Sequence, residues 1–213
     1  MFVNYVRLLT LVCLSALATL IAQPAAAGPG QQNCRIMVHG DSLSAAYGLK
    51  REEGWVALLA QRVESNGHRC DIVNSSISGE TTSGGLSRLP ALLDKHRPTH
   101  LVLELGANDG LRGLDPVAMQ TNLQQMVQLS RKAGAKVLLV GIRVPPNYGK
   151  TYQDKFDAVF VNVAKTQLLP RVTSLLDGFE TDRAAFQPDG LHPVAGVQMR
   201  MLDNVWAQLQ KML

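Results

Sequence analysis

The stretch MVHGDSLS, residues 37–44, places the tripeptide Gly-Asp-Ser directly after a short apolar run. A run of this kind, bounded by a turn-forming tripeptide, is typical of a buried strand. Serine is also among the residues that most often cap a following helix. Ser42 can therefore be read in two ways, as a nucleophile presented at the end of a strand or as the hydroxyl of a helix cap.

Outward from this stretch, short β-rich runs alternate with amphipathic stretches, which indicates a parallel sheet covered by helices. We expect strands at residues 35–39, 71–74, 100–105 and 136–142, and a weaker one near 169–173. Apolar spacing and capping residues predict helices over residues 54–64, around 86–93, from Asp115-Pro116 to Gly134, over 153–166, and from Pro193 towards Met212. This order of elements predicts an α/β protein with a three-layer sandwich.

Length and composition fit one soluble domain: 213 residues, 46% hydrophobic and 18% charged. Residues 1–27 read as a signal peptide, with Arg7 before an apolar run and three alanines before a cleavage site after Ala27. The run is shorter than the ~20 residues of a membrane span, so an uncleaved anchor is the weaker alternative. We expect residues 28–213 to form a single exported domain, periplasmic or alternatively secreted.

Charge gives no reason to expect a nucleic-acid partner, because the formal net charge is only +4 and the basic residues are scattered. Two cysteines, Cys34 and Cys70, follow the signal peptide. In an oxidising compartment an even pair is a candidate disulfide.

Ligand sites of open parallel sheets lie beyond the carboxyl ends of the strands, so the residues that follow each strand are the first candidates for a functional site. Ser42 follows the first strand, Gly79 the second and Asn108 the third, and Asp189-x-x-His192 supplies an acid and an imidazole near the end of the chain. Each has an ordinary structural alternative: helix cap, loop glycine, turn residue and a cap before Pro193. Their joint placement favours an acyl-transfer site with nucleophile, base, orienting acid and oxyanion donors.

Together these blocks resemble the GDSL, or SGNH, hydrolase superfamily. Longer stretches are similar to its bacterial acyl-CoA thioesterase I, lysophospholipase and arylesterase branch: NSSISGE at residues 74–80, RLPALL at 88–93, ELGANDGLRG at 104–113 and RVPPNYG at 143–149. Two departures stand out, because His39 replaces a usual apolar residue and Ala107 a common glycine. No role for His39 follows from the sequence.

This resemblance implies the flavodoxin-like fold of the family, with five parallel strands in the order 2-1-3-4-5. It also implies Ser42 as nucleophile, His192 as base and Asp189 as its orienting acid, with an oxyanion hole formed by the N–H groups of Ser42 and Gly79 and the side chain of Asn108. The implied activity is hydrolysis of carboxylic esters or thioesters, such as acyl-CoA, lysophospholipids or aryl esters, through an acyl-enzyme.

Other chemistries have weak signals. The nucleophile elbow G-x-S-x-G, H-E-x-x-H and C-x-x-C are absent from the sequence, and Val144 stands where a P-loop needs its first glycine. We expect no metal, no cofactor and a monomer. Two alternatives stay open: a carbohydrate O-deacetylase on the same fold, and an envelope-binding module without turnover.

An acyl hydrolase also needs an apolar groove beside its nucleophile. The loops after the third and fourth strands mix apolar residues with glycine or proline, and they are as compatible with plain surface loops as with a groove. The candidate groove residues are Leu111, Leu114, Pro146 and Tyr148. In the implied strand order the first two strands are neighbours, so Cys34 and Cys70 would lie together at the end opposite the site.

Overall fold

The computed structural model describes residues 34–144 and 148–213 of the chain. Its centre is a five-stranded sheet in the order β2-β1-β3-β4-β5, and every neighbouring pair is parallel. This confirms the strand order expected from the sequence. The strands are β1 (Cys34–Gly40), β2 (Cys70–Asn74), β3 (His100–Glu104), β4 (Lys136–Val140) and β5 (Arg171–Val172).

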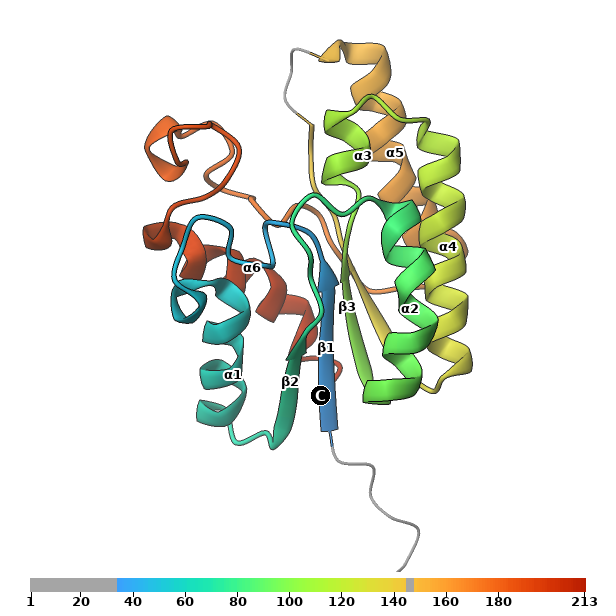
Figure 1. The fold of residues 1–213 in the computed structure, drawn as a ribbon, viewed down its shortest axis with the longest axis vertical. Helices are drawn as coiled ribbons and strands as arrows, with labels where there is room; N and C mark the ends of the chain where they lie inside the picture. The colour runs from blue at the N-terminus through green and yellow to red at the C-terminus, as the bar shows by residue number, and fades with distance from the viewer. Residues whose placement is uncertain (1–33, 145–147) are drawn as a thin grey trace, which may run out of the picture. The chain divides into compact units, whose positions relative to one another are not determined.

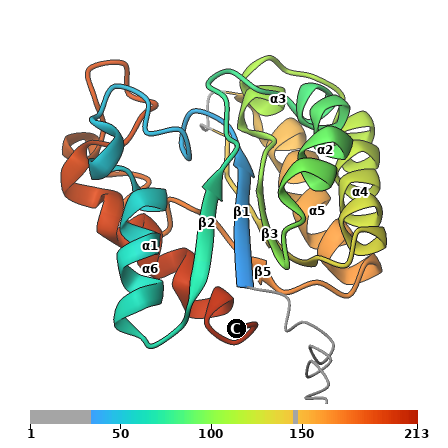
Figure 2. The same ribbon diagram turned by 60° about the horizontal axis from the view of Figure 1, so that its bottom comes forward.

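Helices cover both faces of the sheet, which confirms the three-layer prediction. Figures 1 and 2 show α1 and α6 on one face and α2, α4 and α5 on the other. A short helix, α3, stands above the carboxyl end of β3. The helices are α1 (Trp55–Ser65), α2 (Thr82–His96), α3 (Ala107–Leu111), α4 (Pro116–Lys132), α5 (Lys150–Thr166) and α6 (Gln198–Leu209).

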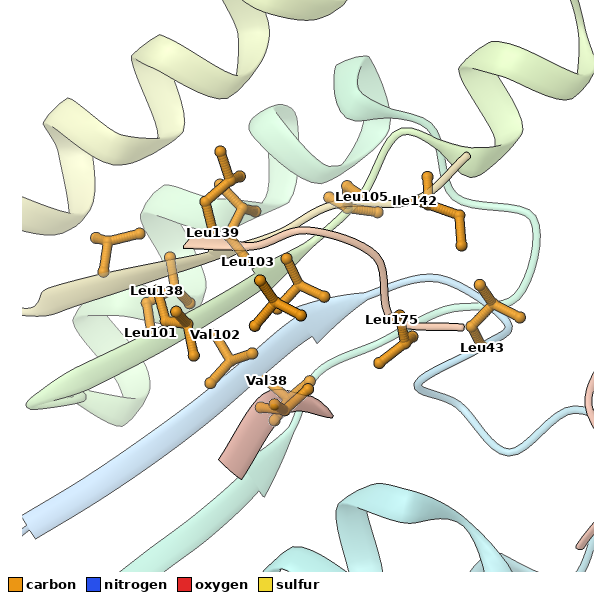
Figure 3. Packing of buried hydrophobic residues seen from close by; sticks show 14 of the residues in the cluster. Val38, Leu43, Leu101, Val102, Leu103, Leu105, Leu138, Leu139, Ile142 and Leu175 are labelled. Carbon is orange, nitrogen blue, oxygen red and sulfur yellow. The ribbon is translucent and has the colours of Figure 1, made fainter. Parts of the chain in front are cut away.

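The core lies on both faces of the three central strands. All five residues of β3 are buried, as expected for a parallel strand covered by helices on each side. Figure 3 shows Val102 of β3 packed among the side chains of its neighbouring strands. This rigid centre holds the ends of β1 and β3 in register, with Gly40 beside Glu104.

Helix α4 begins as the sequence predicts, because the Asp115 side chain accepts the Val117 N–H at 3.0 Å and Pro116 takes the first helical position. The last helix does not. Pro193 forms an isolated antiparallel bridge with Phe186, and α6 begins only at Gln198 after a short 3₁₀ turn. The expected start at Pro193 was wrong because this segment is held extended by its pairing with residues 185–187.

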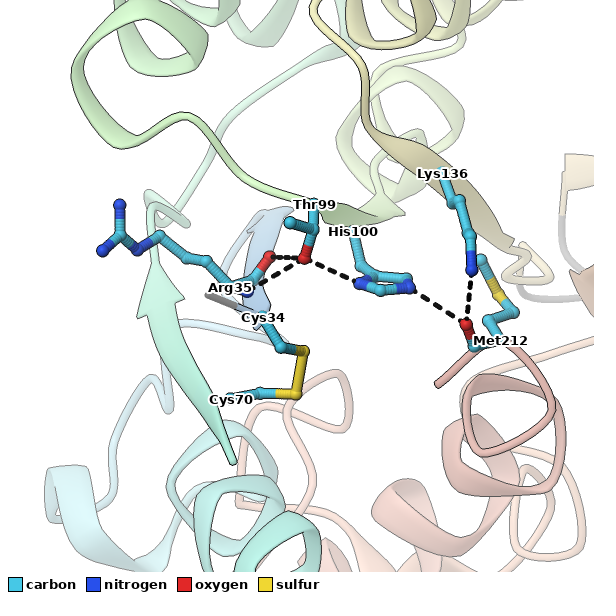
Figure 4. Close-up of a disulfide and its surroundings, with 7 residues drawn as sticks. All are labelled: Cys34, Arg35, Cys70, Thr99, His100, Lys136 and Met212. Atoms are coloured by element: carbon cyan, nitrogen blue, oxygen red, sulfur yellow. Dashed lines mark hydrogen bonds between the residues drawn. A yellow bond between two sulfur atoms is a disulfide. The ribbon is translucent and has the colours of Figure 1, made fainter. Parts of the chain in front are cut away.

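The amino end of the sheet is fastened by several links between distant segments. Cys34 and Cys70 are partners in the β1–β2 register and are joined by a disulfide (Figure 4). Nearby, the ring of His100 and the ammonium of Lys136 both donate to the carbonyl of Met212, at 3.1 and 2.9 Å. These bonds tie the C-terminal segment to β3 and β4.

Two predictions concern residues outside the described ranges: the signal peptide at residues 1–27 and the groove residue Pro146. Within the described ranges, no helix has the length and apolar character needed to cross a membrane.

Candidate active site

The chain leaves β1 through a tight loop that carries Ser42. The side chain of Asp41, and not that of Ser42, accepts the N–H two positions ahead, from Leu43 at 3.0 Å. The next helix, a short 3₁₀ helix, begins only at Arg51. Ser42 is therefore not the cap of a helix, and its hydroxyl is left for another partner.

That partner is the imidazole of His192, whose Nε2 lies 2.9 Å from the Ser42 Oγ. On the other side of the ring, Nδ1 lies 2.7 Å from a carboxylate oxygen of Asp189. A carboxylate only accepts, so Nδ1 carries the proton and Nε2 presents its lone pair to the hydroxyl. The ring of Tyr47 packs over the imidazole with a centroid distance of 4.3 Å. The structure thus joins the three residues that the sequence placed in one site.

Asp189 is fixed by its own loop. Its second oxygen accepts the backbone N–H groups of Leu191 and His192, at 2.9 and 3.0 Å. Burial alone would raise the pKa of Asp189, but the hydrogen bonds from the His192 ring and from these two N–H groups outweigh it and lower the pKa to about 2. Asp189 is therefore charged at any working pH and suits the stabilisation of a protonated imidazole.

Asn108 lies in α3, directly beyond the end of β3. The sequence had suggested a loop at this position, not a helix. Its Nδ2 donates to Asp41 Oδ2 at 3.2 Å and to the backbone oxygen of Glu80 at 3.0 Å. One amide group therefore connects the Ser42 loop with the loop that carries Gly79. Both of its hydrogens have acceptors, so contact with a bound oxyanion requires one of them to be shared.

The backbone N–H groups of Ser42 and Gly79 have no acceptor among residues 34–144 and 148–213. Gly79 has φ of +79°, a conformation that glycine adopts without strain. Its carbonyl accepts from Arg112 Nη2 at 2.9 Å, which fixes the orientation of this stretch of backbone. Unpartnered N–H groups are what an oxyanion hole requires.

A cavity of about 480 Å³ opens beside Ser42, Asn108 and His192. Most of its wall is apolar. An ion pair between Arg143 and Glu180, 2.7 Å apart, contributes a polar part of the lining. The apolar side chains of the wall are Leu43, Ala107, Leu111, Ile142, Val144, Leu176, Phe186 and Leu191.

Of the groove residues expected from the sequence, Leu111 lines this cavity, whereas Leu114 and Tyr148 do not. Leu114 is 42% exposed because it follows the end of α3 and faces outward. Tyr148 packs against the core instead, and its hydroxyl donates to the Leu111 carbonyl at 2.7 Å. Tyr148 thus supports the wall from behind.

A second cavity, of about 520 Å³, lies on the other side of the Ser42 loop, between α1 and the edge strand β2. Its lining includes Ser44 and Arg51 but neither Ser42 nor His192. It therefore does not open onto the reactive hydroxyl. No cluster of three or more metal-ligating side chains occurs in the described part of the chain.

Sequence reasoning missed several residues around the site. Glu104 could have been noticed as a charge at the end of an otherwise apolar strand, whereas Tyr47 and Arg112 carry no signal of their own. His39, which had no expected role, is wholly buried. Its ring links Ser75 Oγ, at 3.1 Å, with the Gly85 carbonyl, at 3.0 Å, and so holds the second strand's loop against α2.

Comparison with known proteins places this geometry in context. Residues 38–196 match the GDSL-like Lipase/Acylhydrolase family. Esterase TesA of Pseudomonas aeruginosa is 48% identical over 84% of this chain and 89% of its own length. Arylesterase of Vibrio mimicus is 40% identical over 98% of this chain and all of its own. Thioesterase 1/protease 1/lysophospholipase L1 of Escherichia coli K12 is 38% identical over 84% of each chain.

The chain is also similar to solved structures of esterases. The crystal structure of TesA has a TM-score of 0.82 and 47% identity, over 84% of this chain and 99% of that one. Esterase EstA from Pseudoalteromonas sp., inhibited by monoethylphosphonate, has a TM-score of 0.80 and 40% identity, over 84% of this chain and 97% of that one.

Proposed function

The chain belongs to the GDSL-like Lipase/Acylhydrolase family and is an ester-bond hydrolase, and from this premise we propose that Ser42 is its nucleophile. The observation that carries the proposal is the chain of contacts from Asp189 through His192 to the Ser42 hydroxyl, with heavy-atom distances of 2.7 and 2.9 Å. Ser42 and His192 line one side of a largely apolar cavity. The substrate class is an acyl ester or thioester.

In the first half of the reaction, Ser42 Oγ attacks the carbonyl carbon of the substrate and His192 Nε2 takes the hydroxyl proton. Asp189 stays charged and stabilises the imidazolium. The negative oxygen of the tetrahedral intermediate is held by the N–H groups of Ser42 and Gly79 and by Asn108. His192 then returns the proton to the departing alcohol or thiol, which leaves an ester on Ser42.

In the second half, water attacks this ester with His192 again as the base, and the free acid departs. The apolar wall favours an acyl chain over an acetyl group on a sugar, because a polar ring would leave its hydroxyl groups unpaired against these side chains. Carbohydrate deacetylation is therefore the weaker reading. A binding module without turnover is disfavoured because nucleophile, base and acid are all in contact.

The experiment is a substrate panel of p-nitrophenyl esters, acyl-CoA thioesters, lysophospholipids and acetylated sugars, run on the wild type and on Ser42→Ala. We expect the wild type to hydrolyse acyl substrates in preference to acetylated sugars. The Ser42→Ala variant should lose on the order of 10⁴–10⁶-fold in kcat. Full activity of Ser42→Ala would remove Ser42 as the nucleophile.

Leu111 offers a test of the acyl cavity, because it lines the cavity and Leu114 does not. A larger side chain at 111 should shorten the longest acyl chain accepted, whereas the same change at 114 should not. We therefore expect Leu111→Trp to shift the preference among p-nitrophenyl esters towards shorter chains, with Leu114→Trp as the matched control. Equal profiles for both variants would place the acyl chain elsewhere.

Export to the periplasm is the proposed location. It is supported by the arginine, apolar run and alanines of residues 1–27 and by the Cys34–Cys70 disulfide, which is typical of oxidising compartments. Osmotic-shock release from expressing bacteria, followed by mass spectrometry, should yield a chain that begins at Gly28. A cytoplasmic chain that retains Met1 would contradict it.

A further inference from the structure

Glu104 is an acidic side chain that the proposed mechanism does not use. It ends β3, and only 1% of its surface is exposed. Its Oε2 accepts the hydroxyl of Ser44 at 2.7 Å and faces the N–H of Asp41 at 3.4 Å. The carboxyl lies so close to β1 that a Cβ at position 40 would come within 2.6 Å of Oε2. Glycine at position 40 therefore leaves room for this carboxyl.

The two groups that Glu104 contacts stand on either side of the nucleophile. Asp41 precedes Ser42, and Ser44 follows two positions later. Holding both fixes the backbone between them, and with it the Ser42 N–H. Asp41 passes the constraint on, because its Oδ2 accepts from the Asn108 amide at 3.2 Å. One side chain from β3 thus anchors the loop of the nucleophile and, through Asp41, the third oxyanion donor.

The nearest further charges to this pair are the carboxylates of Asp109 and Glu80, and Glu80 is itself paired with Arg88 at 2.6 Å. Burial raises the pKa of Glu104 well above its usual value, and the neighbouring Asp41 raises it further. Burial likewise raises the pKa of Asp41, to about 7, against the bonds from Leu43 and Asn108, while Asp109 and Glu80 add repulsion. Two neighbouring buried carboxyls do not both ionise readily. Asp41 accepts an N–H on each of its two oxygens, from Leu43 at 3.0 Å and from Asn108 at 3.2 Å. Among the described residues, the one N–H that faces Glu104 lies 3.4 Å away, so the charge belongs on Asp41 and the proton on Glu104.

We propose that Glu104 is a positioning residue of the active site, an uncharged buried carboxyl that holds the Ser42 loop through Ser44 and Asp41 and thereby sets the oxyanion donors. The inference rests on the proposed function of Ser42. It makes Glu104 important for turnover, although Glu104 touches neither the substrate nor the reacting atoms.

The test compares Glu104→Gln, which keeps an uncharged acceptor, with Glu104→Met, which keeps the volume but accepts no hydrogen bond. We expect Glu104→Met to lower kcat for a p-nitrophenyl ester by about 10- to 100-fold, with KM within about 2-fold, because small displacements of reacting groups are costly. Glu104→Gln should restore kcat to within about 3-fold of the wild type. Glu104→Gln should also leave unchanged the acid limb of the pH profile of kcat, which is the range in which kcat rises with pH.

Ser44→Ala provides a second route, because it removes the hydroxyl donor without changing Glu104. It should lower kcat to a similar extent, and the Glu104→Met/Ser44→Ala double variant should lose no more than either single variant, as expected for one shared interaction. Ser130→Ala, which removes a wholly buried hydroxyl in α4, is the control and should keep the wild-type kcat.

The proposal would be overturned by wild-type kcat in Glu104→Met, by equal losses in the Gln and Met variants, or by additive losses in the double variant. A shift of the acid limb to lower pH in Glu104→Gln would also overturn it, because it would reveal a charge on Glu104. The proposed function has its own readout, since wild-type hydrolysis and its loss in Ser42→Ala do not depend on Glu104.

Discussion

At the amino end of the sheet the polar groups are paired with one another, whereas at the carboxyl end several of them face the cavity. The disulfide and the bonds to the Met212 carbonyl link segments that lie far apart in sequence. At the other end, the N–H groups of Ser42 and Gly79 have no acceptor among the described residues. One end of the strands is thus built for stability and the other for binding charge, and changes at each end should have separable effects.

The largest effect on stability is expected at the disulfide. Cys34 and Cys70 are 36 positions apart, so removing the bridge should lower the free energy of unfolding by about 4 kcal/mol in the chain-entropy model. Denaturation of the Cys34→Ser/Cys70→Ser variant measures it, and kcat well below the melting temperature should not change. The wild type in a reducing buffer should reproduce the loss. A fall in kcat without a fall in stability would break the separation between the two ends.

At the carboxyl end, Asn108→Ala should lower kcat by about 10²–10³-fold, because it removes one of the proposed oxyanion donors. Asn204→Ala is a matched control, since the Asn204 amide also bridges two acceptors, the carbonyls of Leu175 and Asp177, both at 3.0 Å. Both variants should lose similar stability in thermal denaturation, and only Asn108→Ala should lose turnover. Full kcat in Asn108→Ala would exclude it from the oxyanion hole.

His39, the penultimate residue of β1, lies at the carboxyl end, and its effect should show through pH. Burial lowers the pKa of His39 to about 4; the Gly85 carbonyl opposes this shift and Arg88 adds to it. The unfolded chain, with an ordinary histidine pKa near 6.5, binds the proton first, so the folded state loses stability as pH falls from about 6.5 to 4.

The size of this loss is about 3 kcal/mol. Between pH 7 and pH 4, the unfolding free energy of the wild type should fall by about 3 kcal/mol more than that of His39→Leu. Chemical denaturation at both pH values measures it, and the other titrating groups cancel in the difference. A pH-independent difference would mean that His39 is not buried as a neutral ring.

Arg112 should have the smallest effect. It is an exposed side chain that fixes the Gly79 carbonyl through one hydrogen bond of 2.9 Å. Arg112→Ala should lower kcat by about 2- to 5-fold, the value of one such bond. Arg131→Ala, which loses a similar bond to the Gln167 carbonyl far from the site, should leave kcat unchanged. Equal kcat values in the two variants would show that the Gly79 loop is positioned without Arg112.

Much of this comparison could be predicted from the sequence, because alternating apolar runs determine a parallel sheet and parallel strands bring their carboxyl ends together. Ser42, Gly79 and Asn108 could be found for that reason, and Asp189 and His192 because they are three positions apart. Cys34 and Cys70 were expected together at the opposite end, where the disulfide lies.

Other features depend on tertiary contacts that no local pattern records. Helix α3 is only five residues long, too short for a periodic signal. Pro193 resembled a helix start, but its bridge to Phe186 keeps the segment extended. The role of Glu104 depends on its contacts with Gly40 of β1 and with Ser44 in the loop after β1, which are far from it in sequence. Tyr148 follows a strand as a groove residue would, but its hydroxyl is bonded to the Leu111 carbonyl and it does not line the cavity.

The most direct test of the account is covalent labelling of Ser42 by a serine-directed organophosphonate, followed by tryptic mapping. Cleavage after Arg35 and Lys50 releases residues 36–50, which contain Ser42 and Ser44, and fragmentation distinguishes the two hydroxyls. We expect one adduct per chain, on Ser42, formed in step with the loss of esterase activity and absent from Ser42→Ala. Inactivation with the adduct on another residue, or stoichiometric labelling of Ser42 with activity retained, would contradict the assignment.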